Sequence, residues 1–191
     1  MIPETQIPSA PMQKKDSWWD VVRFILITAA IVLPIRFFVV QPFMVSGPSM
    51  EPNFMNNDYL LVDELTYRFE KPQRGDVIIF MQKAENKYLI KRVIGLPGET
   101  VILSGNTITI KNAAHPDGFN IDESFLTYTF SEPPKMIVLD SDHYFVLGDN
   151  RPVSYDSRYW GPLAAEEILG RPLLRLFPFN KIGLFPGKAN L

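Results

Sequence analysis

The sequence contains no cysteine and only two histidines among its 191 residues. The absence of cysteine excludes a thiol nucleophile, a disulfide framework and a cysteine-rich metal centre. His115 and His143 lie far apart with no metal-ligand spacing around them, so we expect neither a metal ion nor a cofactor. The formal net charge of −2 gives no broad basic surface, and nucleic acid is therefore not expected as a partner.

Long helical patterns are scarce too, whereas proline is abundant, with 17 residues. Beyond Gln41 the chain consists of short apolar runs separated by Gly, Pro, Asn and Asp, a pattern typical of β-strands joined by turns. We expect a mostly β domain over residues 41–191, built as a folded β-sheet or a barrel. Its predicted strands are 59–62, 77–80, 88–94, a hairpin of 100–103 and 107–110, 144–147, and one or two within 168–185, while the polar residues 111–135 predict a surface excursion.

The N-terminal 40 residues have a different character. Residues 1–16 are polar and proline-rich and predict a short cytoplasmic tail. Residues 17–40 are predominantly apolar, and about 20 residues in a helix rise about 30 Å, the thickness of a membrane's hydrocarbon core. Arg23 and Arg36 lie near the ends of this segment, where long side chains reach the lipid headgroups. We therefore expect one transmembrane helix, and the basic residues before it favour a cytoplasmic N-terminus.

A cleaved signal peptide and a buried core helix are the alternatives for residues 17–40. A signal peptide carries small residues at its cleavage site, and the sequence Phe-Phe-Val-Val-Gln-Pro over residues 37–42 does not fit that pattern. An uncleaved anchor is the better interpretation.

Lys91 is the first residue that suggests chemistry. In a strand over residues 88–94 it shares one face with Leu89 and Val93, so its ammonium group would lie against apolar neighbours. Loss of solvation disfavours a lysine's charged form, and such a lysine can act as a general base, whereas Arg92 stays protonated. The alternative is an edge strand from which both cations reach solvent.

Ser49 lies in a turn punctuated by glycine and proline, and a turn-forming role is the ordinary explanation for such a serine. A neutral lysine could nevertheless take its proton during attack on a carbonyl group, and backbone N–H groups of the turn could stabilise the oxyanion. His143 beside Asp142 is the rival base, as in a Ser-His-Asp triad, although sequence spacing does not diagnose one.

Several separated motifs together resemble the bacterial type I signal peptidases, the Ser/Lys proteases that remove leader peptides. They occur in the order of that family and cover most of residues 40–185. The matching stretches are 49–52 (Ser-Met-Glu-Pro), 74–77 (Arg-Gly-Asp-Val), 91–99 (Lys-Arg-Val-Ile-Gly-Leu-Pro-Gly-Glu) and the polar segment 148–161.

The resemblance implies that Ser49 is the nucleophile and that neutral Lys91 is the general base and acid. It further implies that Ser154 orients the lysine and that Asp156 and Arg158 brace the surrounding loop. No metal or cofactor is implied.

The resemblance also implies a substrate cleft with small apolar pockets, which exclude large side chains and admit an Ala-X-Ala site. Met50 matches the residue packed beside the nucleophile. Gly47 stands where some members carry a serine that donates to the oxyanion, so this donor is missing, and Asn53 replaces the usual threonine, a change that we expect to affect only the turn. The residues expected to form the pockets are Phe43, Val45, Leu60, Ile79, Leu89 and Ile90.

The implied location is the bacterial cytoplasmic membrane, with a single pass and the catalytic domain on the outer face. Membrane lipid, preproteins bearing signal peptides and the export machinery are the implied partners. Two other functions remain open at this point. One is an inactive membrane-anchored β-domain that binds exported peptides, and the other is a Ser/Lys self-cleaving repressor, which should carry a DNA-binding domain instead of an anchor.

Overall fold

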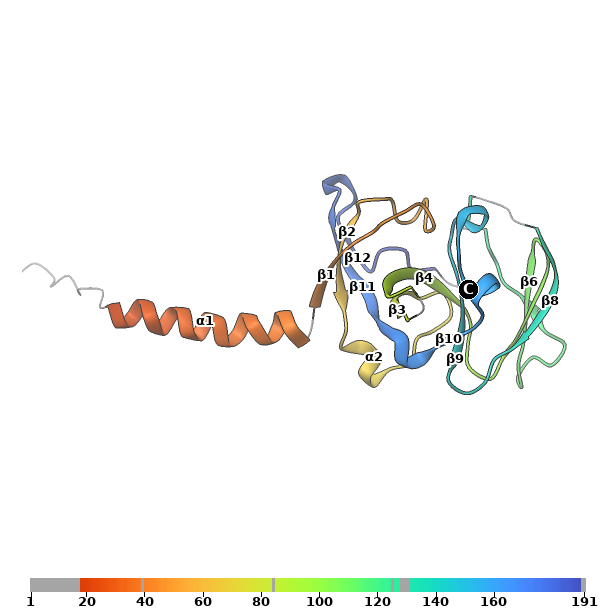
Figure 1. The fold of residues 1–191 in the computed structure, drawn as a ribbon, viewed down its shortest axis with the longest axis horizontal. Coiled ribbons are helices and arrows are strands. Elements are labelled where there is room, and N and C mark those ends of the chain that lie inside the picture. Colours follow the sequence, from red (N-terminus) through yellow and green to blue (C-terminus); the bar gives the residue numbers. More distant parts are fainter. Residues whose placement is uncertain (1–17, 39, 84, 125, 128–130, 190–191) are drawn as a thin grey trace, which may run out of the picture.

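The computed structural model describes residues 18–38, 40–83, 85–124, 126–127 and 131–189. The long helix α1 (Trp18–Phe38) extends away from a β-rich body that contains the rest of the described chain (Figure 1). The tail predicted over residues 1–16 lies outside the described residues. Within the described part of the chain, no helix is both long enough and apolar enough to cross a membrane.

The larger of two sheets contains eight strands in the order β1-β2-β11-β3-β4-β9-β10, with β12 paired to β11. All of its pairings are antiparallel, and β4 is an inner strand between β3 and β9. The strands are β1 (Val40–Met44), β2 (Tyr59–Asp63), β3 (Val77–Gln82), β4 (Lys87–Gly95), β9 (His143–Leu147), β10 (Leu163–Ala164), β11 (Ile168–Phe177) and β12 (Gly183–Leu184).

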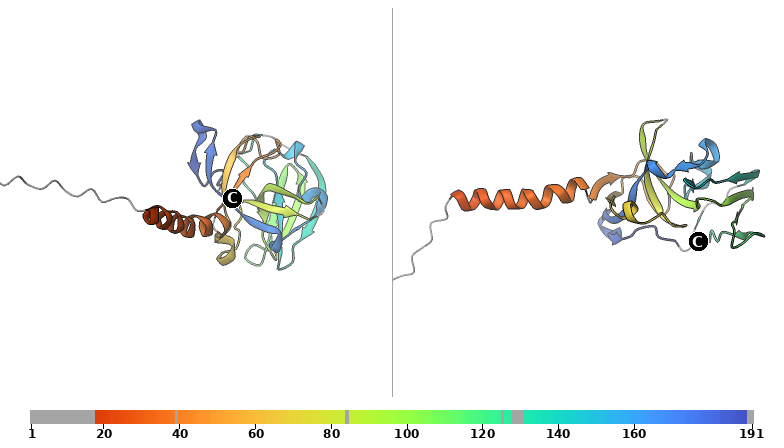
Figure 2. Two further views of the ribbon diagram at one scale, coloured as in Figure 1. Left: turned by 60° about the vertical axis from the view of Figure 1, so that its left-hand side comes forward. Right: turned by 90° about the horizontal axis from the view of Figure 1, so that it is seen from below.

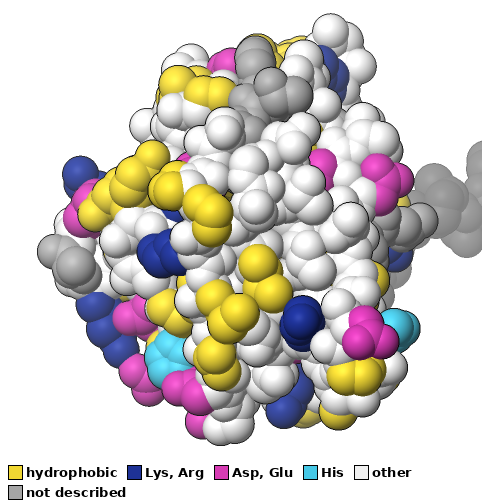
Figure 3. All heavy atoms as spheres, turned by 90° about the vertical axis from the view of Figure 1, so that its right-hand side faces the viewer, with side chains coloured by type: hydrophobic (Ala, Val, Ile, Leu, Met, Phe, Trp, Pro, Cys, Tyr) yellow, Lys and Arg dark blue, Asp and Glu magenta, His cyan; other side chains and the backbone are white. Residues whose placement is uncertain are grey.

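The smaller sheet has the strand order β7-β6-β5-β8. Its strands are β5 (Thr100–Gly105), β6 (Thr107–Lys111), β7 (Phe119–Asn120) and β8 (Glu132–Val138). The predicted hairpin is confirmed, because β5 and β6 pair directly across the turn. The prediction of an excursion over residues 111–135 is wrong in part, since this segment contains β7 and the start of β8. Figure 3 faces this end of the molecule and shows apolar side chains gathered in a band, and β8 exposes Met136 and Val138.

Short helical turns occupy some of the connections. They are α2 (Thr66–Phe69), α3 (Ser157–Trp160) and the 3₁₀ turns η1 (Arg151–Val153), η2 (Ala165–Glu167) and η3 (Phe179–Lys181). Figure 2 shows the described chain from two further sides, with the end of β11 and β12 on the side of the body from which α1 leaves.

The core contains three apolar clusters. One lies under the smaller sheet around Val101, Ile110 and Phe145, another is built around Met50, Phe54 and Leu60, and a third surrounds Phe80, Val93 and Tyr144. The prediction of a mostly β fold is therefore confirmed. The described strands form open sheets without closing a barrel, so the barrel alternative is wrong.

Candidate active site

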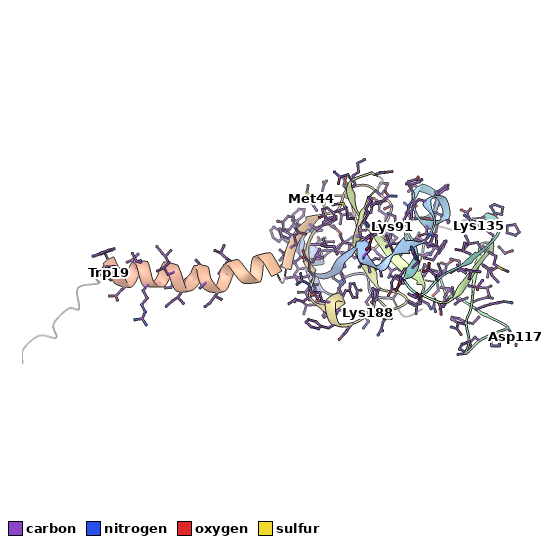
Figure 4. All side chains as sticks on the ribbon, turned by 60° about the horizontal axis from the view of Figure 1, so that its bottom comes forward. Trp19, Met44, Lys91, Asp117, Lys135 and Lys188 are labelled. Carbon is purple, nitrogen blue, oxygen red and sulfur yellow. The ribbon has the colours of Figure 1, made fainter. Side chains whose placement is uncertain are left out.

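A serine and a lysine from distant parts of the chain meet in the β-rich body. Lys91 lies on β4 opposite Ile78 of β3, and Ser49 lies in the turn that follows β1. Lys91 Nζ donates a hydrogen bond to Ser49 Oγ over 2.9 Å. Figure 4 labels Lys91, which lies well inside the body, away from α1. The structure thus brings together the two side chains singled out from the sequence.

The surroundings of Lys91 favour its neutral form. Only 3% of its surface is exposed, and Nζ has a second acceptor in the carbonyl oxygen of Ile90 at 2.9 Å. Burial lowers the pKa of Lys91 to about 8, because an ammonium ion loses solvation there, while the carboxylates of Asp156 and Asp149 act in the opposite direction. The edge-strand alternative is wrong, since β4 is an inner strand. A lysine with this pKa can accept the proton of a hydroxyl group at mildly alkaline pH.

The Ser49 turn is fixed by a glycine, the core and a neighbouring loop. Gly47 has φ +91°, a conformation that favours glycine, and its N–H donates to Asn56 Oδ1 over 2.9 Å. Met50, the residue after the serine, is fully buried. The Ser49 carbonyl oxygen accepts a hydrogen bond from the Asn150 N–H at 3.0 Å. These contacts fix the backbone on both sides of Ser49 and so restrict where its hydroxyl group can lie.

The loop between Gly148 and Arg158 packs directly against this turn. A Cβ added to Gly148 would lie 2.5 Å from the Ser49 carbonyl oxygen and 2.2 Å from Ser154 Oγ, so only glycine fits between them. Ser154 is buried, and its Oγ has no hydrogen-bond partner among the described residues. Its role in orienting the lysine stays a prediction, although the close packing at Gly148 puts it beside the turn.

Asp156 and Arg158 stabilise this loop as an ion pair. Arg158 Nε donates to Asp156 Oδ1 over 2.8 Å, and both side chains are buried. The other carboxylate oxygen of Asp156 accepts from the Gly148 N–H at 3.1 Å. Asp156 therefore connects the helix α3, which it caps, with the glycine that contacts the Ser49 turn.

A second buried ion pair was not foreseen from the sequence. Arg92, next to Lys91, binds Asp149 through two hydrogen bonds of 2.7 and 2.6 Å, and both residues are almost completely buried. Asn53 Nδ2 donates to the same carboxylate at 2.9 Å. The expectation that Asn53 matters only to its turn is thus wrong, because its amide joins the nucleophile turn to the loop. The density of polar residues after β9 was the available signal, but it did not identify the partners.

The residues expected to form substrate pockets are distributed over two clusters. Most of them gather around Met50, and Leu89 packs instead in the cluster of Phe80 and Tyr144. The six predicted pocket residues therefore do not form one apolar cluster, because Leu89 packs apart from the other five. The predicted pocket residues that belong to the Met50 cluster or pack against it are Phe43, Val45, Leu60, Ile79 and Ile90.

The rival base makes different contacts. His143 Nδ1 lies 2.6 Å from Asp140 Oδ1 at the surface, so the acid that this histidine contacts is Asp140. Ser49 instead has the amine of Lys91 at hydrogen-bond distance. The geometry favours a Ser/Lys pair over a Ser-His-Asp triad.

Most of this chain is similar in sequence to known signal peptidases. Residues 18–177 match the family model described as signal peptidase, peptidase S26. Signal peptidase I of Leptolyngbya laminosa is 35% identical, with 92% of this chain and 88% of the relative aligned. Probable signal peptidase I-2 of Synechocystis sp. is 32% identical over 92% of this chain and 80% of its own length. A signal peptidase I of Bacillus amyloliquefaciens is 31% identical over 88% and 90%.

Among solved structures, a signal peptidase I from Enterococcus faecalis V583 is similar. Its sequence identity is 34% and its TM-score is 0.44. The match covers 53% of this chain and 97% of that one.

Proposed function

This chain belongs to the signal peptidase family, peptidase S26, and is a serine endopeptidase of the signal peptidase I type; on that premise we propose that Ser49 and Lys91 are its catalytic dyad. The observation that carries the proposal is the 2.9 Å hydrogen bond between Lys91 Nζ and Ser49 Oγ in a buried setting. The lowered pKa of Lys91 supports the same assignment.

The dyad chemistry follows from this contact. Neutral Lys91 takes the proton of Ser49 Oγ as the oxygen attacks the scissile carbonyl carbon. The lysine then gives this proton to the leaving amine as the C–N bond breaks, and an acyl-enzyme ester remains. A water molecule, deprotonated by the same amine, hydrolyses the ester and releases the signal peptide. We assign the backbone N–H of Ser49 to the oxyanion, because Gly47 has no side chain that could donate.

Cleavage specificity would come from the apolar cluster beside the nucleophile. Phe43 and Ile90 belong to the cluster that contains Met50, the residue after Ser49. Most members of this cluster are almost completely buried, so we expect a pocket that opens there to admit only small side chains. We propose cleavage after Ala-X-Ala on this basis, since exclusion of larger residues discriminates as strongly as attraction.

The location proposed for the enzyme is the outer face of the bacterial cytoplasmic membrane, with α1 as its anchor. Residues 18–33 of α1 expose large apolar side chains, such as Phe24 and Leu26, an arrangement that water disfavours and lipid accommodates. The helix itself extends away from the body (Figure 1). The polypeptide after β11, which lies on the side from which α1 leaves (Figure 2), includes Phe179 and Leu184, and these side chains are 78% and 67% exposed. Lipid would thus confine the enzyme and its preprotein substrates to one layer and raise their effective concentration. The export machinery, which presents these substrates, is the further proposed partner.

Cleavage of a preprotein with an Ala-X-Ala site tests the proposal. Wild type, Ser49→Ala and Lys91→Ala are compared in detergent micelles, and the new N-terminus of the product is sequenced. Wild type should cut after the second alanine, and both variants should be folded and inactive. Cleavage by Lys91→Ala at a near-normal rate would refute the dyad. A folded wild type that binds the preprotein without cutting it would instead support a peptide-binding role.

A further inference from the structure

Two arginines of the loop that packs on the Ser49 turn are anchored from outside that loop. Arg151 and Arg158 are buried, with 1% and 7% of their surfaces exposed. Arg151 Nη2 lies 2.5 Å from Glu123 Oε1, and Arg158 Nη1 lies 2.8 Å from Glu132 Oε1. Glu132 is the first residue of the edge strand β8, and Glu123 follows the short strand β7.

The same guanidinium groups bind the loop's backbone. Arg151 Nε donates to the Gly148 carbonyl oxygen at 2.9 Å. Arg158 Nη2 donates to the carbonyl oxygens of Arg151 at 2.6 Å and Ser154 at 3.2 Å. Each arginine therefore connects one glutamate to the backbone of residues that pack on the dyad.

A third contact joins β8 to this loop. Lys135 Nζ donates to the carbonyl oxygen of Arg158 over 2.9 Å. In Figure 4, Lys135 is labelled on the side of the body farthest from α1, and Lys91 lies between it and the helix. The strand β8 thus contacts the loop through Glu132 and Lys135, and Glu123 adds a contact from the residues after β7.

Burial distinguishes these ion pairs from ordinary surface pairs. The side chains of Glu123 and Glu132 are 15% and 22% exposed. Lys83 and Glu166 form a pair of similar length, 2.5 Å, but are 63% and 74% exposed. Exposed pairs contribute little to stability, whereas removing one partner of a more buried pair is costly.

We propose that Glu123 and Glu132 are positioning residues of the protease. Through them, β8 and the residues after β7 set where Gly148 and Ser154 lie relative to Ser49 and Lys91. This inference rests on the dyad proposed above. It gives the stretch between β6 and β8 a part in the reaction without any contact with substrate. A displacement of about 1 Å in reacting groups can change rates by roughly 100-fold, so small movements of the loop should be visible in kinetics.

Steady-state kinetics of Glu123→Gln and Glu132→Gln test the proposal on the full chain in detergent micelles. Both variants keep the side-chain size and remove the charge. We expect kcat to fall roughly 10- to 100-fold with KM within about twofold of wild type, because the substrate cleft is untouched. Glu123→Asp and Glu132→Asp, which keep the charge, should recover part of the lost kcat. Glu166→Gln, at the exposed pair, is the matched control and should behave as wild type.

Folding is measured on the same samples by circular dichroism and thermal unfolding. Of the two glutamine variants, Glu132→Gln is the one less expected to fold poorly, because Arg158 keeps its ion pair with Asp156. Unchanged kcat in folded Glu132→Gln and Glu123→Gln would overturn the proposal. A rise in KM at constant kcat would overturn it too, since it would show that the stretch binds substrate. A loss of kcat equal to the loss of folded protein would leave only a structural role.

Two further variants distinguish a wrong positioning role for the glutamates from a wrong catalytic dyad. Ser49→Ala and Lys91→Ala are included in every series. If they are inactive while the glutamine variants act as wild type, only the positioning role is wrong. If Lys91→Ala is active, the dyad is wrong whatever the glutamates do.

Discussion

Replacing Lys91 by methionine removes a buried ammonium group while keeping an unbranched side chain of similar length. In the folded protein burial lowers the pKa of this lysine to about 8. In the unfolded chain the pKa returns to its ordinary value of about 10.4. Between these two values the unfolded chain binds more protons than the folded protein. The stability of the wild type should therefore rise with pH across this window, and the methionine variant should lack this contribution.

The magnitude follows from the two pKa values. A difference of about 2.4 at about 1.4 kcal/mol for each pKa unit gives about 3 kcal/mol. Below pH 8 the wild type carries this whole penalty, and above about pH 10.4 it carries none. Loss of the hydrogen bonds to Ser49 and Ile90 in Lys91→Met lowers stability by roughly 1 kcal/mol each when the lysine is neutral. That loss lowers the unfolding free energy of Lys91→Met relative to wild type but has little effect on how the difference between them varies with pH.

The assay is urea unfolding of both proteins in the same detergent, at intervals of half a pH unit from 7 to 11. The measured quantity is the difference in unfolding free energy between Lys91→Met and wild type. Other lysines and the tyrosines titrate in both proteins and cancel in the difference. We expect this difference to move by about 3 kcal/mol in favour of wild type between pH 8 and 10.5. A flat difference would refute the assignment of a lowered pKa to Lys91, and with it the neutral base.

Three further outcomes are expected. For cleavage of a preprotein, kcat/KM should rise about tenfold per pH unit below pH 8 and level off above it, as Lys91 loses its proton; a profile flat from pH 6 to 9 would contradict this. Gly148→Ala should lower kcat roughly 100-fold in a protein with unchanged circular dichroism, because the added methyl group meets the Ser49 carbonyl oxygen at 2.5 Å; activity near that of wild type would show that the loop adjusts freely. Arg92→Met should lower the unfolding free energy by about 3–5 kcal/mol in urea titrations, since the Asp149 carboxylate stays buried without its guanidinium; a loss below about 1 kcal/mol would show that water or another cation replaces it.

The strands that the sequence predicted and those that it missed differ in a physical way. Residues 59–62, 77–80 and 100–110 carry β-branched and aromatic side chains between turns, and all became strands. Four strands were missed, β1, β7, β8 and β10, and all of them lie at the edges of their sheets. Two of them, β1 and β8, contain prolines. Proline is tolerated at an edge, where one side of the strand needs no donor, and at bulges such as the register shift opposite Pro133 and Pro134. In a sequence, proline argues against a strand because it cannot donate a backbone hydrogen bond. Only the order of the strands in the sheet shows that these prolines lie at edges, where they are tolerated.

The candidate site shows the same limit. Ser49 and Lys91 were predictable because each lies in a motif that resembles one family. The ion pairs that hold the site were not, since Arg92 and Asp149 are 57 residues apart and Arg158 and Glu132 are 26 apart. No local sequence pattern predicts which buried arginine forms an ion pair with which acidic residue. Such partners become visible only when the two sheets are assembled.

These arginines also bear on the acid–base balance of the lysine. A neutral Lys91 needs a dry pocket, yet Asp149 and Asp156 act to raise its pKa. Each of these carboxylates binds a guanidinium directly, Asp149 that of Arg92 and Asp156 that of Arg158. An opposite charge at this distance cancels much of the field that a carboxylate exerts farther away. The loop can therefore use carboxylates to hold its backbone beside Ser49 while burial still keeps the lysine's pKa low.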